Sequence, residues 1–430
     1  MSQHLPYNKV FTPHSPVNLS ELFVGRSNQL ERLTRAIYRH GTAPFVVGAR
    51  GVGKTSLLIQ AIKNISAIHK EYVPIHITCD KSFTFDKMSK IALSHLDFDI
   101  NVKQINNETS DSNEVLGEIN LLNTLKLSRK TQNPTKTNII HDGIGNLNIT
   151  PYNLLEILKK LNEPIIIIID EFDIMKNNKD FVNDIAIFIK ILSDHSHSHE
   201  CTIVLSGVGS SMQNLFSAHE SCHRQIVEIF VPMLKQEDIR SFLKKTEELL
   251  DFQFADRVRD ILSTEATGFP YFAHLLGECS YLTAKERNPQ FIFVTEDDYE
   301  YSKEQAAEEA FREQLSQFKN TIRKLQPEEI EIIKCLNLTN SSLEIKEIKH
   351  LAISLNENIE QNFDNILESI IEKYNIIKYH PSDHRKITFI NPLLRPALKL
   401  RIGYPDGKLA ILPKKNKNQI EMIFDENDSK

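Results

Sequence analysis

The chain has 430 residues, of which 25% are charged and 40% hydrophobic, and its formal net charge is −6. This composition is typical of a folded protein with two or three domains, and the acidic balance argues against a protein that coats nucleic acid over its whole surface. It leaves open a local basic face that contacts DNA.

The N-terminal residues 1–17 are predicted to be an extension, and they lack a basic segment followed by an apolar core. The apolar run Ile165 to Ile169 is too short to cross a bilayer. We therefore expect a cytoplasmic protein with no membrane contact. The cysteines are scattered and never in Cys-x-x-Cys spacing, which predicts reduced thiols rather than disulfides or a zinc site: Cys79, Cys201, Cys222, Cys279 and Cys335.

A phosphate-binding loop follows the first apolar strand. Residues 43–47 read as a buried strand, and the pattern Gly-x-x-x-x-Gly-Lys-Thr comes directly after it. Its glycines let backbone N–H groups turn toward a polyphosphate, its lysine reaches the outer phosphates, and its threonine hydroxyl can ligate Mg²⁺. The sequence predicts a site for ATP or GTP formed by Gly48, Arg50, Gly51, Val52, Gly53, Lys54, Thr55 and Ser56.

Residues 98–150 change in character, being rich in Asn, Thr and Ser with weak periodicity, and they are predicted to be an insertion in the nucleotide-binding core. A helix capped by Thr150 and Pro151 is expected to follow.

A second half of the nucleotide site is predicted at the end of an isoleucine strand. Residues 164–173 read as a strand buried on both faces that ends in Asp170 and Glu171. In this Walker B pattern Asp170 would hold Mg²⁺ through its water shell, and Glu171 would polarise the attacking water. Asp173 is expected to be a solvated loop acid or a helix cap.

The next strand, residues 201–207, places Ser206 where a neighbour of the Asp170 strand would present it to the terminal phosphate. Ser206 is either a sensor of that phosphate or only the start of a Gly-rich turn. A helical pattern over residues 181–192 supplies the crossover that a parallel sheet requires, so we predict an α/β core. The run His195-Ser-His197-Ser-His199 lacks further ligands at suitable spacing and is interpreted as a polar loop rather than a metal site.

The rest of the chain is mainly helical. Residues 233–325 are predicted to be a helical lid, in which Thr295 caps a long charged helix running toward Lys324. Residues 326–402 read as three short helices followed by two strands, which suggests a winged helix, and residues 403–430 as a mobile tail. The third helix of this module is acidic, whereas a helix that faces DNA phosphates should be basic.

These motifs, with the segment Leu22-Phe-Val-Gly-Arg-Ser-Asn-Gln-Leu30, make residues 18–400 resemble the AAA+/STAND superfamily of ATPases. More narrowly, the chain resembles bacterial ATPases related to archaeal and eukaryotic origin initiators. The resemblance implies a P-loop core over residues 18–232. It also implies an adenine pocket lined by Phe23, Val24 and Gly25, and therefore ATP with Mg²⁺ rather than GTP.

The resemblance also assigns roles to two residues outside these motifs. Arg224 lies where these ATPases place an arginine finger that reaches a neighbour's ATP, although a surface arginine in a polar loop would read the same way. Pro270 matches the proline of a Gly-x-Pro turn that packs near the nucleotide. No arginine follows it to act as a second sensor. His274 could take the place of that arginine, but we expect it to be a histidine packed between helices.

Two functions follow from the resemblance. The first is an ATP-hydrolysing switch that forms homo-oligomers and controls a separate effector protein, plausibly in anti-phage defence. The second is an ATP-dependent DNA-binding initiator, loader or transposition target selector. Salt-sensitive DNA binding that requires ATP would favour the second function.

Overall fold

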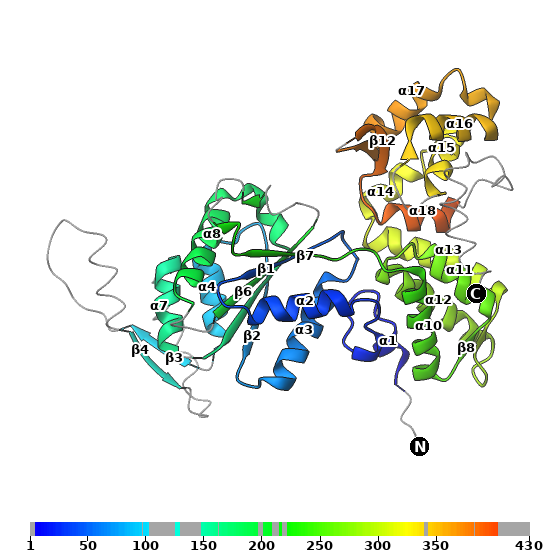
Figure 1. Ribbon diagram of the computed structural model, residues 1–430. Helices are drawn as coiled ribbons and strands as arrows, with labels where there is room; N and C mark the ends of the chain where they lie inside the picture. The colour runs from blue at the N-terminus through cyan, green and yellow to red at the C-terminus, as the bar shows by residue number, and fades with distance from the viewer. Residues whose placement is uncertain are drawn as a thin grey trace. The chain divides into compact units, whose positions relative to one another are not determined.

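The computed structural model describes residues 5–96, 98–102, 125–129, 148–161, 163–196, 201–208, 215–216, 222–338, 343–381 and 383–402 (Figure 1). They form two compact units. The first unit comprises Met1–Gly25, Arg50–Gly53 and Met233–Lys430, and the second comprises Arg26–Ala49 and Lys54–Pro232.

The second unit is built on a five-stranded sheet with the strand order β2-β5-β6-β1-β7. All of its strand pairs are parallel. The strands are β1 (Ala43–Val47), β2 (Val73–Thr78), β5 (Ile165–Asp170), β6 (Cys201–Gly207) and β7 (Ile226–Phe230). Every residue of β1 and β5 is buried, as expected for central strands that are covered on both faces. The predicted α/β core is confirmed.

Helices cover the two faces of this sheet (Figure 1). Alternate strand residues, such as Ile165, Ile167 and Ile169, share one buried apolar cluster with α4, α7 and α8. The helices of this unit are α2 (Ser27–Tyr38), α3 (Lys54–Ile68), α4 (Phe85–Ser94), α7 (Pro151–Leu161) and α8 (Lys179–Asp194), with a 3₁₀ turn at Phe172–Asn177. Thr150 caps α7 through a 3.3 Å bond from the Asn153 N–H, as predicted.

The described parts of the predicted insertion form a β-ribbon rather than only loops. Strand β3 (Phe98–Val102) pairs antiparallel with β4 (Leu125–Arg129), and Phe98 lies opposite Arg129. The low hydrophobicity of the segment concealed this pairing, which is made by backbone groups.

The first unit contains the predominantly helical segment expected after residue 232. Its helices are α1 (Tyr7–Val10), α10 (Gln236–Leu250), α11 (Asp256–Glu265), α12 (Pro270–Arg287), α13 (Glu296–Glu313) and α14 (Ser316–Ile322). A 3₁₀ turn lies at Ser20–Leu22, and two short strands, β8 (Gln253–Phe254) and β9 (Phe293–Val294), pair in parallel.

The predicted long helix from residue 296 toward Lys324 is wrong. Thr295 and Asp298 form the expected capping box at its start, but α13 ends at Glu313. Leu315 leaves the helical region with φ −127° and ψ 24°, and its side chain is fully buried. Burial of this leucine redirects the chain, which the charge pattern could not reveal.

The C-terminal part of this unit has the arrangement of a winged helix. Strands β10, β12 and β11 form an antiparallel sheet beside short helices. The elements are α15 (Pro327–Asn337), β10 (Leu343–Glu344), α16 (Ile345–Leu355), a 3₁₀ turn at Glu357–Ile359, α17 (Phe363–Glu368), a π-turn at Ser369–Lys373, β11 (Ile377–His380), β12 (Asp383–Phe389) and α18 (Leu394–Ile402). The sequence pattern missed the short β10 and the helix α18 that follows the wing strands.

Within the described residues, the five cysteines form no disulfide. Within the described ranges, no helix is long and apolar enough to cross a membrane. His197, His199 and the predicted tail at 403–430 lie outside the described residues, so the interpretations of these segments stay predictions.

Candidate nucleotide site

The phosphate-loop residues take the backbone form that their glycines allow. Gly51 and Gly53 have φ values of 80° and 94°, a region that other residues rarely enter. Helix α3 then begins at Lys54, so its first N–H groups stand at the loop. The Lys54 ammonium donates to the carbonyl oxygens of Gly48 and Ala49 at 3.1 and 3.0 Å. The strand, loop and helix required for phosphate binding are therefore present.

Thr55 and Asp170 meet at the carboxyl edge of the sheet. The Thr55 hydroxyl donates to Asp170 Oδ2 at 2.8 Å. Asp170 is the last residue of β5 and is buried, whereas Thr55 lies in the first turn of α3. The two residues predicted as metal ligands thus lie side by side and offer the oxygen donors that Mg²⁺ prefers.

The carboxylate of Asp170 stays ionised although it is buried. Burial alone would raise its pKa, but the nearby polar groups of His76, Thr55 and Ser206, together with the Glu171 backbone N–H, outweigh burial and lower the pKa to about 2. The Glu171 N–H donates to Asp170 Oδ1 at 2.9 Å. A fixed negative charge at this position suits a group that holds a divalent cation.

His76 is a site residue that the sequence did not reveal. It lies on β2, beside β5, with His76 Nε2 3.5 Å from Asp170 Oδ2. To predict it, one would have to know that the strand carrying this histidine pairs with β5. That pairing cannot be read from the sequence, because β2 and β5 are far apart along the chain.

Glu171 has a left-handed backbone, with φ 56° and ψ 33°. A residue with a side chain adopts this conformation at a cost of about 1 kcal/mol or more, and such strain concentrates at functional positions. Its side chain is exposed directly after the buried Asp170. The conformation places a carboxylate in solvent at the edge where the phosphate loop begins.

Ser206 occupies the place predicted for a sensor. It lies on β6, between the strand of the phosphate loop and the strand of Asp170, and pairs in register with Val46. Its hydroxyl is buried and completes no regular hydrogen bond within the described residues. The hydroxyl lies close enough to Asp170 to lower the pKa of that carboxyl. It can still form a hydrogen bond with another group, such as a phosphate oxygen.

Asp173, expected to be a solvated loop acid or a helix cap, is half-buried and makes a specific backbone contact. Its Oδ1 accepts a 2.8 Å hydrogen bond from the Val208 N–H, so it ties the turn after β5 to the end of β6. It supports the position of the strand end that carries Ser206.

Arg224 lies in an exposed turn immediately before β7. It is therefore at the amino ends of the strands, whereas the phosphate loop follows the carboxyl end of β1. The β1–β7 register aligns Ala43 with Ile226 and Val47 with Phe230. From Ala43 to Val47 the strand β1 is about 13 Å long, at ~3.3 Å per residue. Arg224 is therefore held away from the phosphate loop of its own sheet.

The remaining predicted site residues belong to the first unit. Phe23 and Val24 are half-buried and Gly25 is exposed, and Pro270 is the first residue of α12. Their roles beside the base stay predictions.

The alternative role of His274 as a second sensor is wrong. His274 is 3% exposed and packs against Phe242, with ring centroids 4.3 Å apart. Its Nδ1 accepts from the Thr12 N–H at 3.0 Å, and burial lowers the pKa of His274 to about 3. A neutral, buried imidazole cannot neutralise phosphate charge.

Comparison with known proteins decides the chemistry of this site. Residues 23–264 match the profile of the family described as an ATPase domain predominantly from Archaea. The chain belongs to this family. It is therefore an ATPase, and the phosphate loop and the acidic strand end belong to its ATPase domain. Enzymes of this chemistry use Mg²⁺, which neutralises charge on the transferred phosphoryl group.

Solved structures place this ATPase among known folds. A Walker-type ATPase of Pyrococcus abyssi is 15% identical, with 91% of this chain and 99% of that chain covered and a TM-score of 0.54. The ORC2 protein of Aeropyrum pernix is 13% identical, with 97% and 98% covered and a TM-score of 0.48. The Aeropyrum pernix ORC1 protein, solved in complex with DNA, is 16% identical, with 91% and 96% covered and a TM-score of 0.46. Among curated protein sequences, none matches.

The described residues of this ATPase domain fit Mg²⁺ and a nucleotide. Thr55 and Asp170 supply oxygen donors 2.8 Å apart, Lys54 supplies a cation, and Ser206 supplies a buried hydroxyl with unused capacity. Thr55 and Asp170 would hold the metal ion, directly and through its water shell, and Glu171 would accept a proton from water.

Proposed function

We propose that this ATPase is a molecular switch of the AAA+/STAND type, in which ATP binding drives self-association and hydrolysis resets the assembly. ATP would occupy the loop from Gly48 to Ser56, with its base against Phe23, Val24 and Gly25. Glu171 would activate water, and Ser206 would report on the terminal phosphate. The geometry of Thr55, Asp170 and Glu171 supports turnover rather than storage of ATP.

The location of Arg224 carries the proposal of self-association. It is exposed at the amino end of β7, whereas the phosphate loop follows the carboxyl end of β1. An arginine in this place cannot serve its own nucleotide, but it can enter a neighbour's site and stabilise charge on the transferring phosphoryl group. Assembly would then control hydrolysis.

The edge strand β7 offers a surface for that neighbour. It is the last strand of the sheet, and the Phe230 side chain on it is 62% exposed. Unpaired strand edges and exposed aromatic side chains are common features of association surfaces. We place a subunit boundary along β7.

The switch would control a separate effector protein. We propose that it does so in the cytoplasm of a bacterium, as part of anti-phage defence. This part rests on the sequence resemblance to AAA+/STAND proteins. The ATPase family itself supports nucleotide turnover only.

A DNA-binding initiator, loader or transposition target selector is the second candidate. The wing strands favour it, because Lys378 on β11 and Tyr379 are exposed, and Arg385 on β12 is also exposed although it pairs with Asp383. The acidic α17 argues against the usual insertion of a recognition helix, since Asp364 and Glu368 would face phosphates. Contact through the wing alone would be weak and sensitive to salt.

Mass measurement of the purified chain separates these functions. The Glu171→Gln variant would be measured with ATP and Mg²⁺, with and without duplex DNA, at low and at physiological salt. The switch predicts oligomers that need ATP and are indifferent to DNA, whereas the DNA-binding function predicts oligomers only when both are present. A chain that stays monomeric under all conditions would contradict the proposal.

A further inference from the structure

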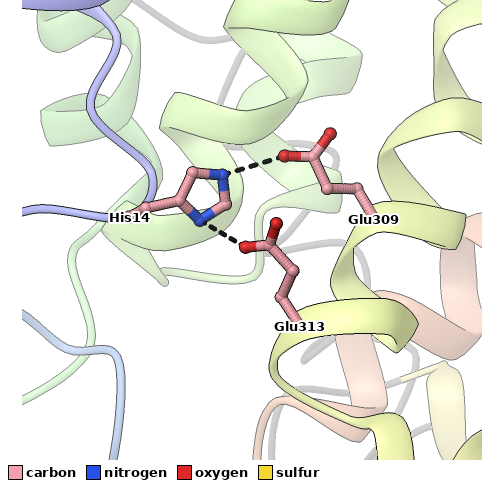
Figure 2. A group of neighbouring side chains, drawn as sticks. All are labelled: His14, Glu309 and Glu313. Carbon is pink, nitrogen blue, oxygen red and sulfur yellow. Dashed lines mark hydrogen bonds and ion pairs between the residues drawn. The ribbon is translucent and has the colours of Figure 1, made fainter.

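His14 lies between two carboxylates of one helix (Figure 2). Its Nε2 is 2.9 Å from Glu309 Oε1, and its Nδ1 is 2.7 Å from Glu313 Oε2. All three residues belong to the first unit, His14 to the segment after α1 and the two glutamates to α13. Residues distant in sequence thus bring one imidazole and two carboxylates together.

The helix geometry accounts for the pair of carboxylates. Glu309 and Glu313 are four residues apart on α13, so their side chains project from the same face. One ligand atom from each of the three side chains lies within 4.8 Å of the other two. Among the described residues, no other group of His, Cys, Asp or Glu meets this criterion. The side chains keep 43%, 27% and 35% exposure, so an ion can enter from solvent.

A buried hydroxyl beside the group lacks a partner. Tyr271 is 7% exposed, its hydroxyl makes no hydrogen bond within the described ranges, and its ring centroid lies 6.3 Å from that of His14. Burial, and then the charges of Glu313 and Glu309, raise the pKa of Tyr271, which places the phenol within electrostatic reach of both carboxylates. A neutral phenol in this position is a donor available to a carboxylate that turns to bind an ion.

We propose that His14, Glu309 and Glu313 form a binding site for a divalent transition-metal ion, best matched by Zn²⁺. One imidazole nitrogen and two carboxylate oxygens are ligands that Zn²⁺ accepts, and water fills the fourth position. The unpartnered Tyr271 hydroxyl can then donate to a ligating carboxylate from outside the coordination shell. Because Glu309 and Glu313 contact different nitrogens of His14, these exposed side chains must rotate to bring one nitrogen and both carboxylates onto a single ion.

The ion would fasten the segment carrying His14 to α13 within the first unit. The proposed ion site shares no residue with the nucleotide site, whose metal ligands Thr55 and Asp170 belong to the second unit. The competing explanation for the same contacts is an ion pair between protonated His14 and the two glutamates, with no metal. The two explanations differ in what the protein binds at neutral pH.

Calorimetric titration of Zn²⁺ into the full-length chain, freed of metal by a chelator and without nucleotide, tests the proposal. The wild type should bind one Zn²⁺ per chain. The double variant Glu309→Gln/Glu313→Gln should bind it at least ~100-fold more weakly, because two ligands are lost. The matched control is Glu304→Gln/Glu308→Gln, an exposed pair with the same spacing on the same helix, which should bind as the wild type does.

Two further readouts keep the result interpretable. Co²⁺ in place of Zn²⁺ should give visible d–d bands without the thiolate charge-transfer band that cysteine ligation would produce. His14→Ala leaves α13 unaltered and should abolish those bands, while Tyr271→Phe should weaken binding about tenfold. Absence of Zn²⁺ binding by the wild type, unchanged binding by Glu309→Gln/Glu313→Gln, or equal loss in the control pair would overturn the proposal.

Discussion

Thr55 and Asp170 are 115 residues apart in the sequence, yet the Thr55 hydroxyl donates a 2.8 Å hydrogen bond to the Asp170 carboxylate. This contact joins the helix of the phosphate loop to the end of the isoleucine strand. It places both predicted metal ligands at one edge of the sheet. We propose that the ATPase chemistry depends on that convergence.

Asp170→Asn should weaken Mg²⁺ binding in the presence of ATP on the order of 100-fold, because the amide cannot replace the charge that orders the water shell of the ion. Equilibrium titration with Mn²⁺ as a spectroscopic substitute would measure the change. Asp173→Asn is the matched control. Asp173 contacts the Val208 N–H rather than Thr55, and an amide oxygen can accept the same hydrogen bond. Equal losses in both variants would contradict the assignment.

Glu171→Gln should retain ATP and slow hydrolysis by about 10²- to 10⁴-fold, because the amide cannot accept a proton from water. Phosphate release and nucleotide binding would be measured on the same preparation. The substitution keeps the side-chain size, so the left-handed backbone at φ 56° should be unaffected. Normal turnover by this variant would show that another group activates the water.

Arg224→Ala should slow hydrolysis by about 10³-fold or more with no loss of nucleotide binding, since an arginine finger acts only on the developing charge. Mixing Arg224→Ala with Lys54→Ala should restore part of the activity, because the phosphate loop of an Arg224→Ala chain can then meet the intact arginine of a Lys54→Ala chain. Lys235→Ala, at an exposed position outside this turn, controls for loss of a surface cation. A mixture as inactive as its components would rule out action across a boundary.

His274 should make the first unit less stable as the pH falls. Its pKa is lowered from 6.5 to about 3 in the folded chain, so between these values the unfolded chain binds a proton that the folded chain does not. The stabilisation is complete above pH 6.5 and is lost on acidification, with a slope of about 1.4 kcal/mol per pH unit.

Denaturant unfolding between pH 6.5 and 5 would measure that contribution as the difference in slope between the wild type and His274→Gln. The difference is needed because burial raises the pKa of Glu278 to about 7, so this carboxyl titrates over the same range with the opposite sign. His274→Gln should remove the contribution, whereas His40→Gln, at an exposed histidine, should leave it unchanged. A wild-type slope equal to that of His274→Gln would contradict the buried, neutral imidazole.

Much of the nucleotide site could be predicted from sequence because its parts are local. A glycine pattern between a strand and a helix, and acids at the end of a buried strand, are readable wherever they occur. His76 could not be predicted, because its role depends on the pairing of β2 with β5. The break of α13 near Leu315 was hidden for a similar reason, since it follows from burial in the folded chain.

The cluster of His14, Glu309 and Glu313 is also invisible in the sequence, because the histidine and the glutamates are joined only by folding. The backbone strain at Glu171 adds information that the acidic motif lacked. The phosphate loop and the acidic strand end could therefore be found from sequence, whereas His76 and the His14 cluster could not, because only long-range packing brings their residues together.

We propose that the phosphate loop and the acidic strand end bind one magnesium-complexed ATP. Calorimetric titration of Mg²⁺-ATP into the wild type, Lys54→Ala and Glu171→Gln would measure this binding. We expect one site per chain in the wild type and in Glu171→Gln, and no detectable binding by Lys54→Ala. Undiminished binding by Lys54→Ala would contradict it.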